Sequence, residues 1–249
     1  MNKLYIFGGD YSSNFNETYG LYEDWKKGVL PKTWPEILAK KIDFELVNMA
    51  KEGVSNYTIF SQFMDVCTEV KFGDILIFGW TNLNKSRIAN KDNELIELNS
   101  RNVIEDSEMS IQTINEINEN RNSEAWATEI HMWMKFINEF CLKSNIEPYY
   151  WTTDKKLYKD YDKFQNDKRY LMIKELDFKE MGVVEFITSP YYNNQKITKS
   201  TISQETFGDI IDFRLGEYGH INLAEFFYKY ITFYTDFLNI KKVKPKTLI

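Results

Sequence analysis

Apolar residues along the chain form short, nearly continuous runs that alternate with stretches of helical periodicity. Runs of this kind are typical of strands buried on both faces of a parallel sheet. The predicted strands span residues 3–8, 44–50, 74–80, 147–153 and 183–188. Because strands and helices alternate, right-handed crossover connections are expected. The pattern therefore predicts a three-layer, doubly wound α/β fold, with a parallel sheet of about five strands and helices on both faces.

The predicted helices carry apolar residues three or four positions apart. They span residues 33–42, 55–70, 123–144 and 220–238, and Thr33 is a candidate N-cap for the first. Two stretches, 84–122 and 154–182, lack this rhythm and are predicted to be polar excursions from a single domain over residues 1–249. In such a fold the functional site is expected among the loops at the carboxyl ends of the strands.

Composition and charge narrow the class of protein. With 249 residues, 43% of them hydrophobic, the chain can bury one substantial core. The net charge is −6 and no basic cluster is dense, so nucleic-acid binding is not expected. No apolar run approaches ~18 residues, so no membrane span is expected and the protein is predicted to be cytoplasmic. Cys67 and Cys141 lack CxxC spacing, which favours buried thiols over a disulfide or a metal site, and no cofactor motif is found.

Four sequence blocks follow one another in an informative order. A strand ending in IFGGD is followed by NMAKEGVSNYTI, then by a strand ending in IFGWTN, and finally by DFRLGEYGHINLAEF. In this order and spacing the blocks resemble the SGNH (GDSL-type) hydrolase family, in particular its phage and phage-like branch. The resemblance covers most of the chain. It implies a flavodoxin-like sheet, a serine nucleophile in the first block that attacks an acyl carbonyl, and a histidine base in the last block.

The resemblance also implies an oxyanion hole, because negative charge that develops on the acyl oxygen needs hydrogen-bond donors aimed at it in advance. Gly53 matches the glycine of the second block. Thr81 and Asn82 stand where the third block supplies a polar donor. A tight turn at Gly53 and a loop-capping amide at Asn82 are equally good interpretations of these residues.

The nucleophile and the base are expected to be substituted. When the first block is aligned without gaps to a family pattern of the type I-F-G-D-S-F-S-x-N-F, Asp10 occupies the position of the nucleophilic serine. The last block places Asp212 at the acid and Arg214 at the base. Because the pKa of arginine lies above ~12, Arg214 cannot accept a proton near neutral pH. The sequence therefore predicts a catalytically degenerate relative, used as a structural or binding component, in the host cytoplasm or a virion if the protein is phage-encoded.

An active serine esterase or carbohydrate O-deacetylase is the alternative prediction. In that case Ser12 or Ser13 would be the nucleophile and His220 the base, with Glu217 or Asp212 as the acid. The Gly-His context of His220, however, matches a later position in the family, where the last helix begins. An acyl or carbohydrate ligand is compatible with either prediction.

The two substituted positions together predict a contact. Asp10 and Arg214 replace a hydroxyl and an imidazole that meet in an active family member, and their charges are opposite. We therefore expect the carboxylate and the guanidinium to lie within about 4 Å of each other, with Asp212 sharing the guanidinium.

The composition of two segments predicts that the protein self-associates or binds other proteins. The excursion at 84–122 and the aromatic helix at 220–238 offer more surface than a small hydrolase of this type needs. Self-association, or docking into a larger complex, is therefore expected.

Overall fold

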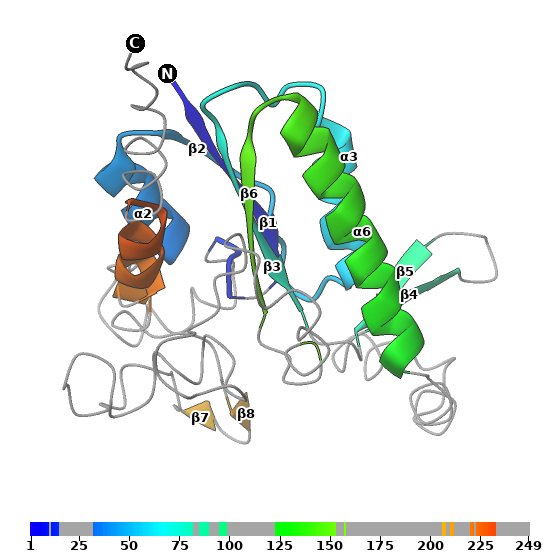
Figure 1. Cartoon of the computed structure of the whole chain (residues 1–249). Coiled ribbons are helices and arrows are strands. Elements are labelled where there is room, and N and C mark those ends of the chain that lie inside the picture. Colours follow the sequence, from blue (N-terminus) through cyan, green and yellow to red (C-terminus); the bar gives the residue numbers. More distant parts are fainter. Residues whose placement is uncertain are drawn as a thin grey trace, which may run out of the picture.

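The structure is a computed structural model, and its centre is a parallel sheet. It describes residues 1–9, 11–14, 32–81, 85–89, 95–98, 123–152, 157, 206–207, 210–211, 220–221 and 223–232. The strands of this central sheet are β1 (Lys3–Gly8), β2 (Glu45–Asn48), β3 (Ile75–Trp80) and β6 (Glu147–Thr152). They form a four-stranded sheet in the order β2-β1-β3-β6, and all neighbours are parallel (Figure 1). This is the strand order of a flavodoxin-like, doubly wound fold, as the sequence predicts.

Helices cover both faces of this sheet (Figure 1). Helices α3 (Asn56–Val66) and α6 (Ser123–Lys143) pack on one face. Helix α2 (Trp34–Ile42) packs on the other face together with the C-terminal helical segment, residues 220–221 and 223–232. The prediction of three layers is therefore confirmed. None of the helices in the described ranges is long and apolar enough to cross a bilayer.

Strand β1 shows how the sequence divides the core into two layers. Its four central residues are fully buried and point alternately to the two faces. Tyr5 and Phe7 face α3 and α6, where Phe7 stacks on Phe78 with ring centroids 4.7 Å apart. Leu4 and Ile6 face α2 and the C-terminal helical segment. An unbroken apolar run is therefore required at β1, because neither face meets water.

Local signals explain where α2 begins and ends. Its N-cap is Thr33, whose backbone N–H and hydroxyl both donate to the carboxylate of Glu36, at 2.6 and 2.9 Å. Pro35 occupies the first turn, where a missing N–H costs nothing. The helix ends at Asp43, which adopts the left-handed conformation with φ +58°. The N-cap prediction for Thr33 is therefore confirmed.

The sequence prediction and the structure differ in several elements. The excursion at 84–122 contains an antiparallel hairpin, β4 (Ser86–Ala89) and β5 (Leu95–Leu98), which the sequence analysis did not identify. A second small pair, β7 (Thr206–Phe207) and β8 (Ile210–Ile211), is too short to leave a sequence pattern. Helix α3 ends at Val66, before the predicted end at residue 70, and a turn follows.

Other predictions lie outside the described residues or hold only in part. The strand predicted at 183–188 lies outside the described residues, and so does the excursion at 154–182 apart from the buried Leu157. Both cysteines are thiols, but only Cys141 is buried. Cys67 is partly exposed because it caps the end of α3, where the helix gives way to a turn at the surface.

Candidate functional site

The turn that follows β1 packs against the end of its own strand. The backbone N–H groups of Ser12 and Ser13 both donate to the carbonyl oxygen of Gly9, at 2.9 and 3.1 Å. A Cβ on Gly8 would lie 3.0 Å from Oγ of Ser12 and 3.3 Å from the carbonyl oxygen of Gly79. A side chain at position 8 would therefore have to push Ser12 or the neighbouring strand aside, which favours glycine there. Ser12 itself is buried, so its hydroxyl is not presented to solvent as an accessible nucleophile would be.

Asn48, the last residue of β2, fixes this turn from the neighbouring strand. Its Nδ2 donates to the carbonyl oxygen of Ser12 and to Oδ1 of Asn14, both at 2.9 Å. Its Oδ1 accepts from the backbone N–H of Ala50 at 3.1 Å. Asn48 is not among the predicted site residues, although a polar residue at the carboxyl end of an apolar strand is a signal of such a position.

The ends of the second and third blocks are held by a side-chain bridge. Asn56, the first residue of α3, donates from Nδ2 to the carbonyl oxygen of Thr81 at 2.9 Å and accepts the N–H of Thr81 at 2.7 Å. The side chain of Thr81 also lies beside the first block, because a Cβ on Gly9 would be 3.6 Å from its Oγ1. Gly53 adopts the left-handed conformation with φ +76°, so its role as a turn glycine is observed.

His220 lies at the start of the C-terminal helical segment, where its imidazole caps another helix. Nδ1 of the buried ring accepts a hydrogen bond from the backbone N–H of Trp34 at 3.2 Å. Trp34 is the first residue of α2, so the ring satisfies one of the amides that a helix start leaves without an intrahelical partner. An accepting Nδ1 carries no hydrogen, and the neutral ring therefore carries its proton on Nε2.

The burial of His220 also decides its acid–base chemistry. Desolvation lowers the pKa of the imidazole from its ordinary value of 6.5 to about 3. A general base works best when its pKa is near the operating pH, and its lone pair must be able to reach the proton. In this geometry the lone pair on Nδ1 already accepts the Trp34 amide. His220 is thus built as a neutral structural acceptor.

Trp34 connects three parts of the fold that lie far apart in sequence. Its indole Nε1 donates to the carbonyl oxygen of Tyr11 in the turn after β1, at 2.8 Å. Its ring packs edge-on against Trp151 of β6, with centroids 6.0 Å apart, and against Phe227 of the C-terminal helical segment, at 4.6 Å. The helical pattern of residues 33–42 predicts that Trp34 lies in a helix, but no sequence signal points to these contacts.

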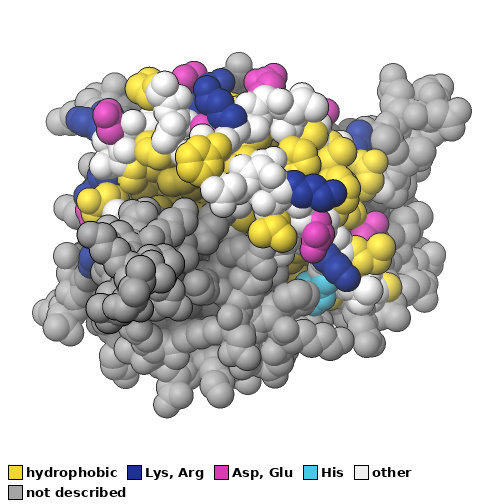
Figure 2. Space-filling view, turned by 45° about the horizontal axis from the view of Figure 1, so that its top comes forward, with side chains coloured by type: hydrophobic (Ala, Val, Ile, Leu, Met, Phe, Trp, Pro, Cys, Tyr) yellow, Lys and Arg dark blue, Asp and Glu magenta, His cyan; other side chains and the backbone are white. Residues whose placement is uncertain are grey.

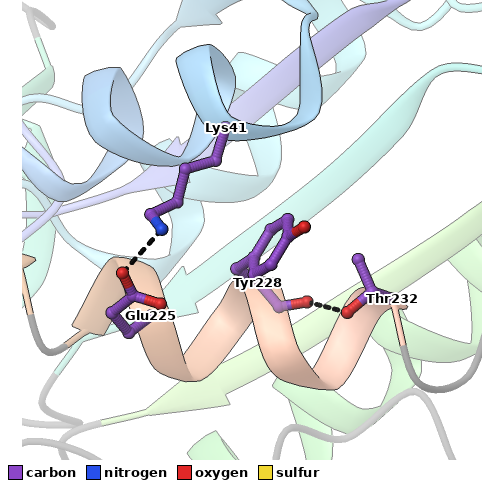
Figure 3. Close-up of polar contacts among 4 residues, drawn as sticks. All are labelled: Lys41, Glu225, Tyr228 and Thr232. Carbon is purple, nitrogen blue, oxygen red and sulfur yellow. Dashed lines mark hydrogen bonds and ion pairs between the residues drawn. The ribbon is translucent and has the colours of Figure 1, made fainter.

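The C-terminal helical segment is also joined to α2 at the surface (Figure 3). Nζ of Lys41 lies 2.6 Å from Oε1 of Glu225, and the same ammonium lies over the ring of Tyr228, 5.1 Å from its centroid. Within the segment the hydroxyl of Thr232 donates to the carbonyl oxygen of Tyr228 at 2.7 Å. These contacts are partly exposed, so they orient the segment more than they stabilise it.

Comparison with known proteins identifies the fold. No family model matches the chain, and no curated protein matches it in sequence. Among solved structures, the chain is similar to a protein from Desulfitobacterium hafniense DCB-2 assigned as a lipolytic protein of the G-D-S-L family. The TM-score is 0.50 at 13% sequence identity, over 92% of this chain and 99% of that one. The chain has an SGNH-type fold. At this identity the similarity establishes the architecture alone.

The structure describes only some of the predicted residues of the SGNH site. Ser12, Ser13, Gly53, Thr81 and His220 are described, and the contacts above place Ser12, Ser13 and Thr81 around the carboxyl ends of β1 and β3. The other predicted site residues lie outside the described residues; they are Asp10, Asn82, Asp212, Arg214 and Glu217. The contact between Asp10 and Arg214 therefore stays a prediction. Across the described ranges, no three His, Cys, Asp or Glu side chains gather as a metal site would require.

Proposed function

We propose that this SGNH-fold protein has no serine hydrolase activity and serves as a binding or structural component. The observation that carries the proposal is the state of His220, whose Nδ1 caps α2 and whose pKa is lowered to about 3. The chain has two histidines. The other, His131, belongs to α6, which packs on the opposite face of the sheet from α2. Arg214, at the aligned base position, cannot accept a proton near neutral pH.

The same site suggests what the protein binds. The carboxyl edge of the sheet, where open α/β folds bind their ligands, has a turn fixed by Asn48 and a strand end fixed by Asn56. An acyl group or a carbohydrate is the ligand class that the family resemblance suggests. The resemblance of the four blocks to the phage branch leads us to propose a phage-encoded protein that acts in the host cytoplasm or in the virion.

Labelling with a fluorophosphonate probe for active serines tests the absence of hydrolase activity. We expect no labelling of the native protein above the level of the heat-denatured protein, because no base is available to activate a serine hydroxyl. An active GDSL esterase labelled in the same reaction serves as the positive control. Labelling of the native chain that disappears in Ser12→Ala or Ser13→Ala would overturn the proposal.

An active esterase or carbohydrate O-deacetylase is the second candidate, because the fold is shared with a protein assigned as lipolytic and Ser12 lies at the end of β1. This candidate requires His220 to release the Trp34 amide and turn toward Ser12 or Ser13. Labelling that is lost in His220→Asn, which keeps an acceptor for the Trp34 amide but cannot act as a base, would support the second candidate directly.

Unfolding experiments on Asp10 and Arg214 test the proposed replacement of the catalytic pair. If the proposed pair is buried, Asp10→Ala or Arg214→Ala alone should lower the free energy of unfolding by roughly 3 to 5 kcal/mol, because each would leave a charge without its partner. The double variant Asp10→Ser with Arg214→His should lose less than either single variant, since it restores a neutral pair. Urea titrations of the three variants measure this order. A double variant that loses as much free energy of unfolding as the two single variants together would show that the two residues are not in contact.

A further inference from the structure

Helices α3 and α6 together expose an apolar surface on the outside of their layer. Met132 and Phe136 of α6 are 66% and 48% exposed, and Tyr57 and Met64 of α3 are also exposed. Figure 2 shows one face of the molecule, with a band of hydrophobic side chains across its width; the apolar surface of α3 and α6 is defined by the exposed residues just named. Single exposed apolar residues are ordinary, but a contiguous group marks an interaction surface.

Ring contacts make this surface continuous across the two helices. Phe60 of α3 stacks on Trp133 of α6, with centroids 5.3 Å apart and planes 7° from parallel. Phe60 also meets Phe136 edge-on at 5.9 Å, and Tyr57 meets Trp133 at 6.1 Å. The guanidinium of Arg87 lies 5.3 Å from the centroid of Tyr57 at one border. Partly buried aromatic rings with charged residues at the border are the composition expected of a protein interface.

Two charged residues on the exposed side of α6 lie symmetrically about Phe136 and have opposite charges. Glu129 lies seven residues before Phe136 and Lys143 lies seven residues after it. Seven residues are nearly two full turns, so both side chains share the face of Phe136, about 10.5 Å away on either side. When two copies of α6 run antiparallel and cross at Phe136, each Glu129 faces Lys143 of the second copy. In a parallel pair, by contrast, Glu129 would face Glu129 of the second copy, and Lys143 would face Lys143.

We propose that this protein forms a two-fold symmetric dimer through the outer surface of α3 and α6, defined by Tyr57, Phe60, Met64, Met132, Trp133 and Phe136. The occupant of the surface is a second copy of the chain, with the two α6 helices antiparallel and Phe136 on the two-fold axis. A two-fold interface pairs the same patch on both copies, which the order of charges on α6 satisfies. The interface is independent of the proposed function, and it differs from the segments 84–122 and 220–238 that the sequence suggests for self-association.

Sedimentation velocity of the full chain tests the dimer. Native protein at about 50 μM should sediment as a dimer, and Phe136→Glu should weaken the dimer at least tenfold by placing two carboxylates at the axis. The matched control is Leu142→Glu, because Leu142 is 73% exposed on α6 but points away from this surface. Circular dichroism verifies that each variant keeps its helix content. A native protein that stays monomeric at this concentration, or a Phe136→Glu variant that dimerises like the native chain, would overturn the proposal.

A charge exchange tests the antiparallel arrangement without touching the apolar residues. Glu129→Lys and Lys143→Glu should each weaken the dimer roughly five- to tenfold, because each places like charges opposite one another. The double variant should regain native affinity. Phe136→Cys in a Cys67→Ser background should form a disulfide-linked dimer on oxidation, because the residue meets its own copy at the axis. Failure of the double exchange to restore the dimer would refute this geometry.

Discussion

The Trp34→Ala variant is expected to lose roughly 3 to 5 kcal/mol of the free energy of unfolding, as is usual when a large buried aromatic side chain is removed. Trp34 is fully buried, and its ring contacts both Trp151 and Phe227. Removal of the ring leaves a cavity between α2, β6 and the C-terminal helical segment and leaves the carbonyl oxygen of Tyr11 without its indole donor. Urea denaturation followed by far-ultraviolet circular dichroism measures the loss. A loss below about 1 kcal/mol would show that the site collapses around the missing ring.

The Trp34→Phe variant separates packing from hydrogen bonding. Phenylalanine keeps an aromatic ring and the backbone N–H that His220 accepts, but it cannot donate to Tyr11. We expect a smaller loss of about 1 to 3 kcal/mol. Hydrogen exchange should accelerate at the amides of Ser12 and Ser13, because the turn loses its external anchor while the bonds to Gly9 remain. Unchanged exchange there would mean that Asn48 alone holds the turn.

Acidification is expected to destabilise the protein through His220. The pKa of the folded imidazole is about 3, below its ordinary value of 6.5, because burial disfavours the charged ring. Below pH ~6.5 the imidazole of His220 binds a proton in the unfolded chain but not in the folded chain. The contribution of His220 to the free energy of unfolding is therefore complete above this pH, and it falls by about 1.4 kcal/mol for each pH unit between ~6.5 and ~3. The loss is about 2 kcal/mol at pH 5, a large part of a typical total stability. Urea titrations between pH 5 and 7 measure it, above the range where most carboxylates titrate.

Two substitutions show whether His220 is the source of this pH dependence. His220→Asn keeps an acceptor where Nδ1 lies, but its side chain does not titrate. The slope of the free energy of unfolding against pH, between pH 5 and 6.5, should therefore decrease by the equivalent of one proton. His131→Asn in α6 is the matched control, because it leaves the bond to Trp34 in place and the slope due to His220 should persist. A His220→Asn variant with the native slope would show that the pKa of His220 is the same in the folded and the unfolded chain, which would contradict this prediction.

The sequence predicts much of the fold because the relevant signals are local or periodic. The strand predicted at 3–8 is observed as Lys3–Gly8, since a strand covered on both faces must be apolar at every position. Helix α2 is predicted by Thr33 and the apolar spacing after it. The hairpin of β4 and β5 escaped prediction because its strands lie in a stretch rich in Asn, Glu and Ser with only scattered Ile and Leu. Strand β2 is equally short but belongs to a longer apolar run, which is the signal that predicts a buried strand.

The candidate site is harder to predict, because its contacts join residues that are distant along the chain. The Gly-His sequence correctly indicates that His220 lies where the last helix begins. It cannot show that the ring caps α2, since Trp34 is 186 positions earlier and only the folded sheet brings the two together. The bond from Asn48 to Ser12 depends in the same way on β1 and β2 being neighbours. Sequence patterns and motifs therefore predict which helix or strand a residue belongs to, and the topology of the sheet decides which residues come into contact.

The bond between Trp34 and His220 also has a consequence for how the protein is made. During synthesis the N-terminal residue of the pair emerges from the ribosome 186 residues ahead of its partner, which is roughly 10 to 40 s at ordinary elongation rates. Throughout that interval Leu4 and Ile6 lack the C-terminal part of the layer that buries them, and the backbone N–H of Trp34 lacks its acceptor on His220. This apolar sheet face is therefore covered only by α2 until the C-terminal helical segment has emerged, and chaperone binding or aggregation would compete with folding in that interval.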